Sequence, residues 1–567
     1  MNILLVNIPS IPYFLLDRVI KSEDSQEIPI SLDIPMGLLY VASYARKYAS
    51  RDFNIKILDI NKEVHQILRF KKGQNASNSE KGVSELFNYI IFQTISNFRP
   101  SIIGINILFA TVQQTAIFVS QIFRELCPEA YIVGGGGQAT NMYSTILNNS
   151  SFDAIICGEG EAPFTELINM YETHKKEYPI SGIVSRTNLN QNITKAEMIN
   201  DLDKIPFPAY DLLGIDYYIN QLDTVRAVND GSVKALPIFT TRGCPMRCSF
   251  CASHSVHGRK IRARSLQNIY EEIEDMIDKF HINTLLIEDD LFTYSKQRTI
   301  KFCEEVIKRN WNLNIEFTSG IAIWTLDETV IDMLAKAGTT VINIAIESGS
   351  PYIQTNIIKK NLNLEHARKV AEVISRYPDI QSRAFYVIGF PGEQREHIHE
   401  TMDFAKSLPI DWSVFQIAMP LPGSELFEEC VSLGYVQQDG NIDDYYKSYL
   451  NRTFDTKEFS KEEIEQIQSD MNIQINFLHN RNIWKGNYKK ALSIFQKIVE
   501  SYPFHTIARY CAWKCLSKIN MHEDAQKELE SIFYWIKKDK RSWELYDRYK
   551  SFLDIPVGII DDQDSLN

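Results

Sequence analysis

Three cysteines lie close together in the middle of the chain, in the segment Thr241-Arg-Gly-Cys-Pro-Met-Arg-Cys-Ser-Phe-Cys251. Spacings of three and then two residues allow three thiolates to meet one small inorganic core, and iron–sulfur clusters are held by thiolates. A [4Fe–4S] cubane with three protein ligands keeps one iron open for a further ligand. Gly243 suits the sharp turn that such a loop needs. We therefore predict that Cys244, Cys248 and Cys251 hold a [4Fe–4S] cluster.

Two other interpretations of the cysteines stay open. Cys251-Ala-Ser-His254 would complete a Cys3His zinc site, and structural cysteines can also cluster by chance. We favour the cluster because the loop directly follows a predicted strand of a parallel barrel. Functional residues of such barrels collect at the carboxyl ends of the strands.

The barrel is predicted from strand-like runs that alternate with helical patterns. One helix-like segment has apolar residues at the three- and four-residue spacing of a core-facing helix, from Leu266 to Phe280. Six such units predict a partial (β/α)6 barrel over residues 236–454, whereas a closed barrel would need two more units. The strand-like runs are 237–241, 284–288, 314–319, 341–347, 383–389 and 413–419.

Polar residues follow these strands at what should be one rim of the barrel. Taken singly, each could belong to a turn or a helix cap, but together they favour a binding site. They are Asp289 and Asp290, Ser319, Glu347 and Ser348, and the Ile388-Gly-Phe-Pro-Gly-Glu393 turn that contains Gly389.

The three-cysteine loop, with the aromatic Phe250 before its last cysteine, resembles the radical S-adenosylmethionine (SAM) superfamily. The resemblance implies that the open iron is chelated by the amino and carboxylate groups of SAM. It also implies SAM contacts along the rim, with either Asp289 or Asp290 on the amino group. The implied contacts are Phe250, Asp289, Asp290, Ser319, Glu347, Ser348, Gly389 on the adenine side, and Arg383 on the carboxylate, for which a surface salt bridge is the alternative.

Residues 1–172 also alternate strand-like and helix-like segments, which predicts a doubly wound, Rossmann-like (flavodoxin-like) parallel sheet. A glycine run at 134–137 follows a strand and opens a helix, where backbone can approach a ligand. Together with residues 35–44 and 157–161, this run resembles the cobalamin-binding domain that precedes many radical SAM enzymes. The resemblance implies cobalamin contacts at Gly134, Gly135, Gly136, Gly137, Gln138 and Glu159.

Many cobalamin domains supply a histidine to cobalt from the loop after the first strand. This chain has no histidine before His65, so we expect cobalamin to bind without a histidine ligand. His65 follows the second strand and is predicted to lie at the surface. A vestigial domain that no longer binds cobalamin stays an alternative.

The remaining segments are a polar stretch at 173–235, predicted to be a linker, and a helical region at 455–567. Gly486 to Phe495 is echoed 34 residues later, with Ala491 matched by Ala525. This period is typical of tetratricopeptide (TPR) repeats and predicts TPR-like hairpins at about residues 484–540. A helical cap docked on the barrel is the alternative.

Composition restricts the class of protein. The chain has 567 residues, of which 44% are hydrophobic, and a net charge of −12, which argues against a nucleic-acid binder. No run approaches the roughly 20 apolar residues of a membrane span, and the odd number of cysteines, nine, fits a reducing compartment. We predict a cytoplasmic protein.

These predictions combine into a cobalamin-dependent radical SAM C-methyltransferase. It would act on an unactivated carbon through a 5′-deoxyadenosyl radical and methylcobalamin. We expect a small-molecule or peptide substrate and an electron donor such as flavodoxin or ferredoxin, and the TPR-like helices suggest a protein partner by analogy. The alternatives are a radical cyclisation, rearrangement or oxidation without methyl transfer, and a TPR-like scaffold with a degenerate barrel. A methylthiotransferase fits less well, because only Cys127 and Cys157 lie upstream.

Overall fold

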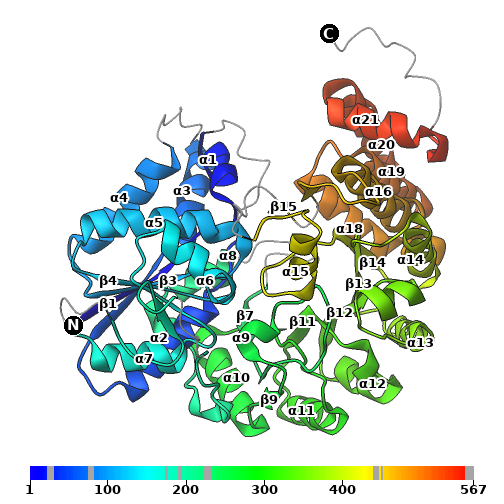
Figure 1. The fold of residues 1–567 in the computed structure, drawn as a ribbon. Helices are drawn as coiled ribbons and strands as arrows, with labels where there is room; N and C mark the ends of the chain where they lie inside the picture. Colours follow the sequence, from blue (N-terminus) through cyan, green and yellow to red (C-terminus); the bar gives the residue numbers. More distant parts are fainter. Residues whose placement is uncertain are drawn as a thin grey trace.

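The computed structural model describes residues 1–21, 31–74, 82–172, 177–189, 195–221, 233–438, 446–448 and 451–555. The chain forms two six-stranded sheets, one in each of two neighbouring domains, and a helical domain packs beside the second (Figure 1). Among the described residues, no helix is long and apolar enough to cross a membrane.

The N-terminal sheet has the strand order β2-β1-β3-β4-β5-β6, and its first five strands are parallel. Its order reverses between β1 and β3, as in flavodoxin-like folds, so the predicted sheet is confirmed. The strands are β1 (Asn2–Asn7), β2 (Asn54–Asp59), β3 (Ile102–Asn106), β4 (Tyr131–Gly135), β5 (Ala154–Ile156) and β6 (Ile183–Ser185).

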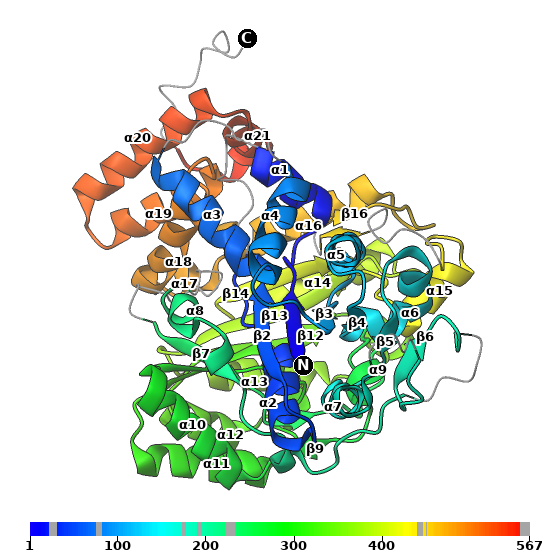
Figure 2. The same cartoon turned by 90° about the vertical axis from the view of Figure 1, so that its left-hand side faces the viewer.

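Helices cover both faces of this sheet because alternate strand residues point to opposite sides. On β1, Ile3 and Leu5 pack against α2 (Met36–Tyr48) and α7 (Glu161–Met170). The helices on the other face pack against Leu4 and Val6 of β1 (Figure 2). They are α1 (Tyr13–Lys21), α3 (Ile60–Gln74), α4 (Val83–Ile95), α5 (Gln113–Leu126) and α6 (Gly137–Asn149).

Part of the predicted linker belongs to this domain instead. β6 pairs antiparallel with β5, and α8 (Ile215–Gln221) buries Tyr218, whose hydroxyl donates to Asp59. A three-residue strand carries too little alternation to be recognised in a polar stretch. Residues 173–176, 190–194 and 222–232 of the predicted linker lie outside the described residues.

The second sheet forms a partial barrel of six parallel strands in the order β14-β13-β12-β11-β10-β7, as predicted. Its two end strands, β7 and β14, do not pair with each other, so the barrel stays open. The strands are β7 (Ala235–Ile238), β10 (Thr284–Ile287), β11 (Asn314–Ile321), β12 (Thr339–Glu347), β13 (Gln381–Ile388) and β14 (Trp412–Ile417).

The outer helices of the barrel begin at side chains that cap their first turns. Ser265 accepts from the Asn268 amide at the start of α10 (Leu266–Phe280), and Asp327 accepts from Val330 at the start of α12 (Glu328–Lys336). The buried face of α10 includes the predicted positions Ile269, Ile273 and Met276. The others are α11 (Lys296–Arg309), α13 (Leu364–Ile374), α14 (Arg395–Ser407) and α15 (Glu425–Ser432).

The helical domain docks on the open edge of the barrel at β14. Asn476, in the π-helical turn Gln474–Leu478, bonds both the amide and the carbonyl of Ser413, and Gln468 donates to the Phe415 carbonyl. These amide side chains satisfy edge groups that would otherwise lack partners. This contact fits the alternative given above, in which the helical region is a cap docked on the barrel. The helices are α16 (Lys461–Ile473), α17 (Arg481–Trp484), α18 (Tyr488–Ser501), α19 (Thr506–Lys518), α20 (His522–Lys538) and α21 (Lys540–Tyr549).

The TPR-like repeat at about 484–540 stays a prediction. Successive helices from α18 to α21 do pack on one another, and the small residues Ala491 and Ala525 are buried between them. Two short strands, β15 (Tyr446–Ser448) and β16 (Asn451–Arg452), precede the domain.

Candidate functional site

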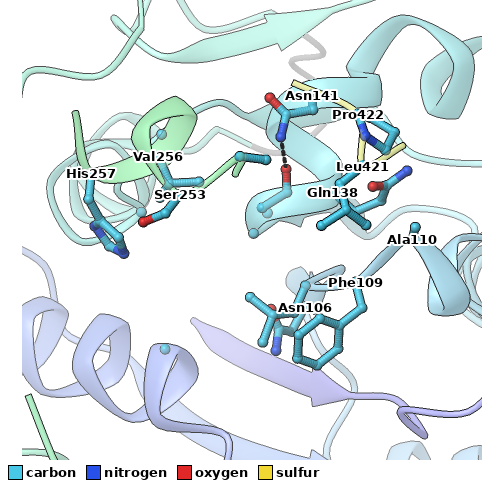
Figure 3. A pocket seen from close by; sticks show the side chains of 18 of the residues that line it. Asn106, Phe109, Ala110, Gln138, Asn141, Ser253, Val256, His257, Leu421 and Pro422 are labelled. Carbon is cyan, nitrogen blue, oxygen red and sulfur yellow. Dashed lines mark hydrogen bonds between the residues drawn. The ribbon is translucent and has the colours of Figure 1, made fainter. Parts of the chain in front are cut away.

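A cavity of about 850 Å³ lies where the carboxyl edge of the N-terminal sheet meets the open rim of the barrel. Side chains from both domains line it, among them Asn106 at the end of β3, Phe109 after that strand, and Ser253 and His257 around α9 (His254–His257) (Figure 3). Ligands of open parallel sheets bind at this edge, where the strand order reverses. Both predicted binding regions therefore open into one space.

The cysteine loop is held rigidly beside this cavity. Gly243 has a φ of +88°, and a Cβ there would lie 2.4 Å from the Lys260 carbonyl oxygen, so only glycine fits. The Cys244 amide donates to the Gly258 carbonyl at 3.3 Å, and the Ser249 amide donates to the Ile358 carbonyl at 3.1 Å. These contacts fix the loop from both ends.

The three cysteines are half-buried and close enough to influence one another's charge. Burial raises the pKa of the Cys248 thiol to about 11, and the neighbouring Cys251 and Cys244 add to the effect. Thiolates at such positions form when a metal displaces the proton. Within the described residues, no three or more His, Cys, Asp or Glu side chains are grouped to hold a single metal ion. The structure thus adds no support for the Cys3His zinc site.

The two candidate aspartates after β10 have different surroundings. Asp289 is buried and accepts hydrogen bonds from the Thr240 amide at 2.5 Å and the Thr241 hydroxyl at 3.0 Å. Burial raises the pKa of its carboxyl to about 6. Asp290 lines the cavity and accepts from the Ser253 hydroxyl at 2.7 Å. Asp289 therefore links the end of β10 to Thr240 and Thr241, and of the two aspartates only Asp290 lines the cavity.

Glu347 and Ser319 also line the cavity, as the sequence predicts. Glu347 has a φ of +70° at an irregularity in the pairing of β12, a strained conformation for a residue other than glycine. Its carboxylate accepts from Lys360 Nζ at 2.8 Å, and the same ammonium donates to the Ala345 carbonyl at 2.7 Å. Lys360 was missed by the sequence analysis, because nothing in its local pattern marks it.

Of four further predicted SAM contacts, only Phe250 lines the cavity. Phe250 lines the cavity, with its ring 6.2 Å from that of Phe390. Ser348 is fully buried and bonds Thr401 at 3.0 Å. Arg383 does not line the cavity, whereas Phe385 and Val387 of the same strand do.

Gly389 is the fourth. It lies away from the cavity, and a Cβ there would meet Ile464 of α16 at 2.7 Å. Its φ of +82° shows that the turn itself requires a glycine.

The predicted glycine run forms one wall of the cavity. Gly136 has a φ of +114°, and a Cβ there would lie 2.7 Å from the Ile107 carbonyl oxygen. Gln138 is buried and donates from Nε2 to Gln113 Oε1 at 2.8 Å. The lack of side chains leaves a broad surface free along the sheet edge. Its glycines are Gly37, Gly104, Gly134, Gly135, Gly136, Gly137, Gly158 and Gly160.

Two large apolar side chains face this wall. Leu108 and Phe109, after β3, are 49% and 44% exposed and line the cavity. Solvent-exposed apolar side chains in a cavity are typical of a ligand site. The sequence carries a signal for this pair that the predictions above do not include, since Leu108-Phe109 follows a strand at the point where the strand order reverses.

Glu159, predicted to contact cobalamin, instead forms buried ion pairs. Its carboxylate is bound by Arg262, with Nη1 to Oε2 at 2.9 Å and Nη2 to Oε1 at 2.6 Å, and by His257 Nδ1 at 3.0 Å. Burial raises the pKa of this carboxyl, but the bonds from Arg262 and His257 outweigh it and hold the pKa far below its usual range. Arg242, two residues before Cys244, bridges Glu159 at 3.3 Å and Glu161 at 2.6 Å. These ion pairs join the N-terminal domain to both flanks of the cysteine loop.

His65 corrects one prediction. It is buried rather than at the surface, and its Nδ1 lies 2.8 Å from the Tyr217 hydroxyl. Its partner comes from α8, in the part of the sequence predicted to be a linker, so the sequence could not reveal it. The imidazole does not line the cavity.

A family model of the radical SAM superfamily matches residues 238–405. The chain carries a radical SAM domain. The match begins at the last residue of β7 and ends in α14, so the radical SAM domain spans the cysteine loop and the rim residues. The identification made from the three-cysteine loop is confirmed.

Matches to known proteins extend beyond the radical SAM domain, over 59–79% of this chain. Cytidylyl-2-hydroxyethylphosphonate methyltransferase of Streptomyces wedmorensis is 25% identical, over 79% of this chain and 87% of that protein. An uncharacterised methyltransferase of Pyrococcus horikoshii is 28% identical, over 70% of this chain and 78% of that protein. Anaerobic magnesium-protoporphyrin IX monomethyl ester cyclase of Rubrivivax gelatinosus is 26% identical, over 59% and 60%.

Two solved structures share the fold. The radical SAM methyltransferase TsrM of Kitasatospora setae, with cobalamin and a [4Fe–4S] cluster bound, aligns with a TM-score of 0.54 at 18% identity and covers 76% of this chain and 75% of that one. The cobalamin-dependent radical SAM enzyme OxsB, with aqua-cobalamin and SAM bound, aligns with a TM-score of 0.55 at 16% identity, over 97% and 75%.

Proposed function

We propose that the protein is a cobalamin-dependent radical SAM methyltransferase that methylates an unactivated carbon. The observation that carries the proposal is the single cavity, which Cys251 and the rim residues Asp290, Ser319 and Glu347 share with the glycine wall. Two cofactors bound at these two regions would face each other across one substrate. Two relatives named as methyltransferases, 25% and 28% identical to this chain, support the same activity.

The donor set fits an iron–sulfur cluster that leaves one iron open. Cys244, Cys248 and Cys251 supply three thiols from one fixed loop, and thiolates are the ligands that such clusters take. Asp290 is the group that fits the SAM amino group, since its carboxylate reaches the cavity and Asp289 does not. Ser319 and Glu347 provide further polar contacts on the next two strands.

The glycine wall fits a large flat cofactor. Any side chain at Gly37, where an added Cβ would meet nothing within 4 Å, would project into free space that cobalamin could fill. Apart from His257, which is bound to Glu159, no histidine lines the cavity in the described residues. This supports cobalamin binding without a histidine on cobalt.

When bound, the reduced cluster would split SAM to give the 5′-deoxyadenosyl radical, and cobalamin would carry the methyl group. The protein itself positions the two cofactors and the substrate and excludes water from the cavity. The apolar walls contributed by Phe109, Phe385 and Met419 keep stray hydrogen donors away from a reactive carbon radical. The finer assignments, a flavodoxin- or ferredoxin-type electron donor and a small-molecule or peptide substrate, belong to this proposal.

The experiment is anaerobic reconstitution with iron, sulfide and hydroxocobalamin, followed by product analysis with SAM and a reductant. We expect both 5′-deoxyadenosine and S-adenosylhomocysteine in the presence of the substrate. Cys248→Ala should abolish iron uptake and both products. Protein that takes up no cobalamin and forms no S-adenosylhomocysteine would contradict the proposal.

A second candidate is a radical cyclisation or oxidation without methyl transfer. It is favoured by the relatives named as anaerobic magnesium-protoporphyrin IX monomethyl ester cyclases. The same assay separates the two, because such a reaction forms 5′-deoxyadenosine without S-adenosylhomocysteine.

A further inference from the structure

A second cavity lies at the opposite end of the barrel from the cysteine loop and the rim. It has a volume of about 500 Å³ and lies between the turns that lead into β13 and β14 and the segment that joins α17 to α18. It shares no lining residue with the catalytic cavity. This cavity therefore belongs to the interface of the barrel with the helical domain, and such interfaces are common positions for ligand sites.

The barrel side of this second cavity carries an apolar surface. Tyr377 and Pro378 come from the turn between α13 and β13, and the buried Pro409 comes from the turn before β14. Ile519, at the end of α19, adds to the same lining. A surface of this kind accepts the organic part of a ligand better than it accepts a bare ion.

The carboxylate among the described lining residues, that of Asp411, is already bonded on both oxygens. Oδ2 accepts from the Ser382 amide at 2.8 Å and lies 2.9 Å from Lys490 Nζ. Oδ1 accepts from Asn482 Nδ2 at 2.8 Å. The negative charge of Asp411 is thus balanced by Lys490, and the pair connects the barrel to the helical domain.

Three more cations line the second cavity: Arg481, Lys485 and Lys489. None of them forms an ion pair with a carboxylate in the part of the chain that the structure describes. Arg481 Nε is buried without a hydrogen-bond partner among those residues, and Arg481 Cζ lies 4.6 Å from the centre of the Trp484 ring, which holds the guanidinium in place. Burial and the charge of Arg481 lower the pKa of the Lys485 ammonium, so these two cations lie close enough to repel each other.

The start of α18 adds to the preference for an anion. Asn487, at its N-cap, makes no side-chain cap hydrogen bond, and the Ala491 amide donates to the Asn487 carbonyl. The amides of Tyr488, Lys489 and Lys490 precede this first helical hydrogen bond and have no partner within the helix. These three residues line the cavity, and a helix N-terminus attracts negative charge through its dipole and its free amides.

We propose that the second cavity binds a phosphomonoester, a small organic molecule that carries one phosphate group. Arg481, Lys485 and Lys489 bind the phosphate, and the organic part packs on Tyr377 and Pro378. A phosphate monoester carries between one and two negative charges at neutral pH and several acceptor oxygens, which match three unpaired cations and a helix N-terminus. A cavity of about 500 Å³ has the size of a small-molecule site. The site goes beyond the proposed function, because the catalytic cavity does not reach it.

The test is a double charge reversal, Lys485→Glu with Lys489→Glu. Both side chains are exposed and neither makes a hydrogen bond or an ion pair within the described residues, so the fold should be kept. The matched control, Lys301→Glu with Lys537→Glu, makes the same change in charge at exposed positions of α11 and α20. The reconstituted proteins, with excess SAM and hydroxocobalamin to fill the catalytic cavity, are titrated by calorimetry with inorganic phosphate and with adenosine monophosphate.

We expect the wild type and the control to bind both probes, and the Lys485/Lys489 variant to bind them about tenfold or more weakly, because like charges then face the anion. Adenosine monophosphate should bind at least as tightly as phosphate, since its organic part gains contact with the apolar surface. Phosphate should also raise the melting temperature of the wild type and the control more than that of the variant. Higher ionic strength should weaken binding to the wild type.

A wild type that binds neither probe, or a Lys485/Lys489 variant that binds them as tightly as the control, would overturn the proposal. Tighter binding of phosphate than of adenosine monophosphate would overturn the assignment of a phosphomonoester in favour of an inorganic anion. If the double variant does not fold, Lys489→Gln removes a single charge and should still weaken phosphate binding about threefold. None of these measurements depends on turnover, so their failure is distinguishable from failure of the proposed function.

Discussion

Arg262 binds the carboxylate of Glu159 through both of its terminal nitrogens, and the pair connects the two domains across the cavity. Both side chains are almost fully buried, 3% and 2% exposed. Arg242 and His257 contact the same carboxylate from either side of the cysteine loop. The position of the sheet domain relative to the cysteines is therefore set by one shared anion.

Replacing Glu159 by Gln should strongly destabilise the protein. After the change, Arg262 and Arg242 stay buried, but only the Glu161 carboxylate, which pairs with Arg242, is left to balance their charges. Breaking a buried ion pair costs about 3–5 kcal/mol. Urea unfolding measures the loss. The control, Glu365→Gln, removes an exposed carboxylate 3.8 Å from Arg368 and should leave the unfolding free energy nearly unchanged. A Glu159→Gln protein as stable as this control would show that the ion pairs do not hold the domains.

Sequence patterns predicted the parts of the fold that repeat. The alternation of strands and helices predicted both parallel sheets, and the cysteine spacing predicted the radical SAM domain. They could not predict pairings between distant segments, such as Glu159 with Arg262, because a carboxylate in a Gly-Glu-Gly turn looks the same whether it meets a ligand or an arginine. The contact of Asn476 with Ser413 at the barrel edge could not be predicted for the same reason.

The two neighbouring aspartates illustrate the limit most sharply. Both follow the same strand, and the sequence left open which one contacts SAM. Burial separates them, since Asp289 is 3% exposed and bonded to Thr240 whereas Asp290 lines the cavity. That difference arises from which way each side chain points at the end of β10, which spacing alone does not determine.

Asp290→Asn should weaken SAM binding without lowering stability. Losing a charge-assisted hydrogen bond to an ammonium costs about 1.5–3 kcal/mol, which corresponds to a roughly tenfold to hundredfold higher dissociation constant. Equilibrium binding of SAM to the reconstituted protein measures it.

Asp289→Asn is the matched variant, and it should show the opposite pattern. It removes the acceptor oxygen that serves Thr240 or Thr241 in the buried rim, so the melting temperature should fall. If Asp290→Asn bound SAM as tightly as the wild type, the assignment of Asp290 would be wrong.

Two glycines of the wall should respond differently to alanine. At Gly136, the φ of +114° and the Ile107 carbonyl at 2.7 Å from the added Cβ make Gly136→Ala strained, so both stability and cobalamin uptake should fall. At Gly37, in α2, nothing lies within 4 Å, and Gly37→Ala should raise stability by about 0.5–1 kcal/mol. Because this methyl group projects into the cavity, cobalamin uptake should fall even in the more stable protein. Normal uptake by Gly37→Ala would place cobalamin elsewhere.

Glu393 should make the stability of the protein depend on pH in an unusual direction. Burial raises the pKa of its carboxyl to about 8, although the amides of Phe390 and Gly389 and the charge of Arg452 oppose the rise. Oε2 accepts from both amides, and Oε1 has no hydrogen-bond partner among the described residues, as suits a neutral acid. In the folded protein the carboxyl therefore keeps its proton at pH values where the unfolded chain, with its ordinary value near 4.5, has lost it.

The sign of the pH effect follows from this difference. A raised folded pKa stabilises fully below about pH 4.5, and the contribution is lost as the pH rises through about 8. Glu393→Gln keeps an oxygen for the two amides but cannot ionise. Its unfolding free energy relative to the wild type should therefore rise between pH 5 and pH 8, by up to about 1.4 kcal/mol per pH unit. Glu396→Gln, an exposed change three residues further on in the first turn of α14, should show no such trend. A pH-independent difference for Glu393→Gln would mean that Glu393 is ionised in the folded protein.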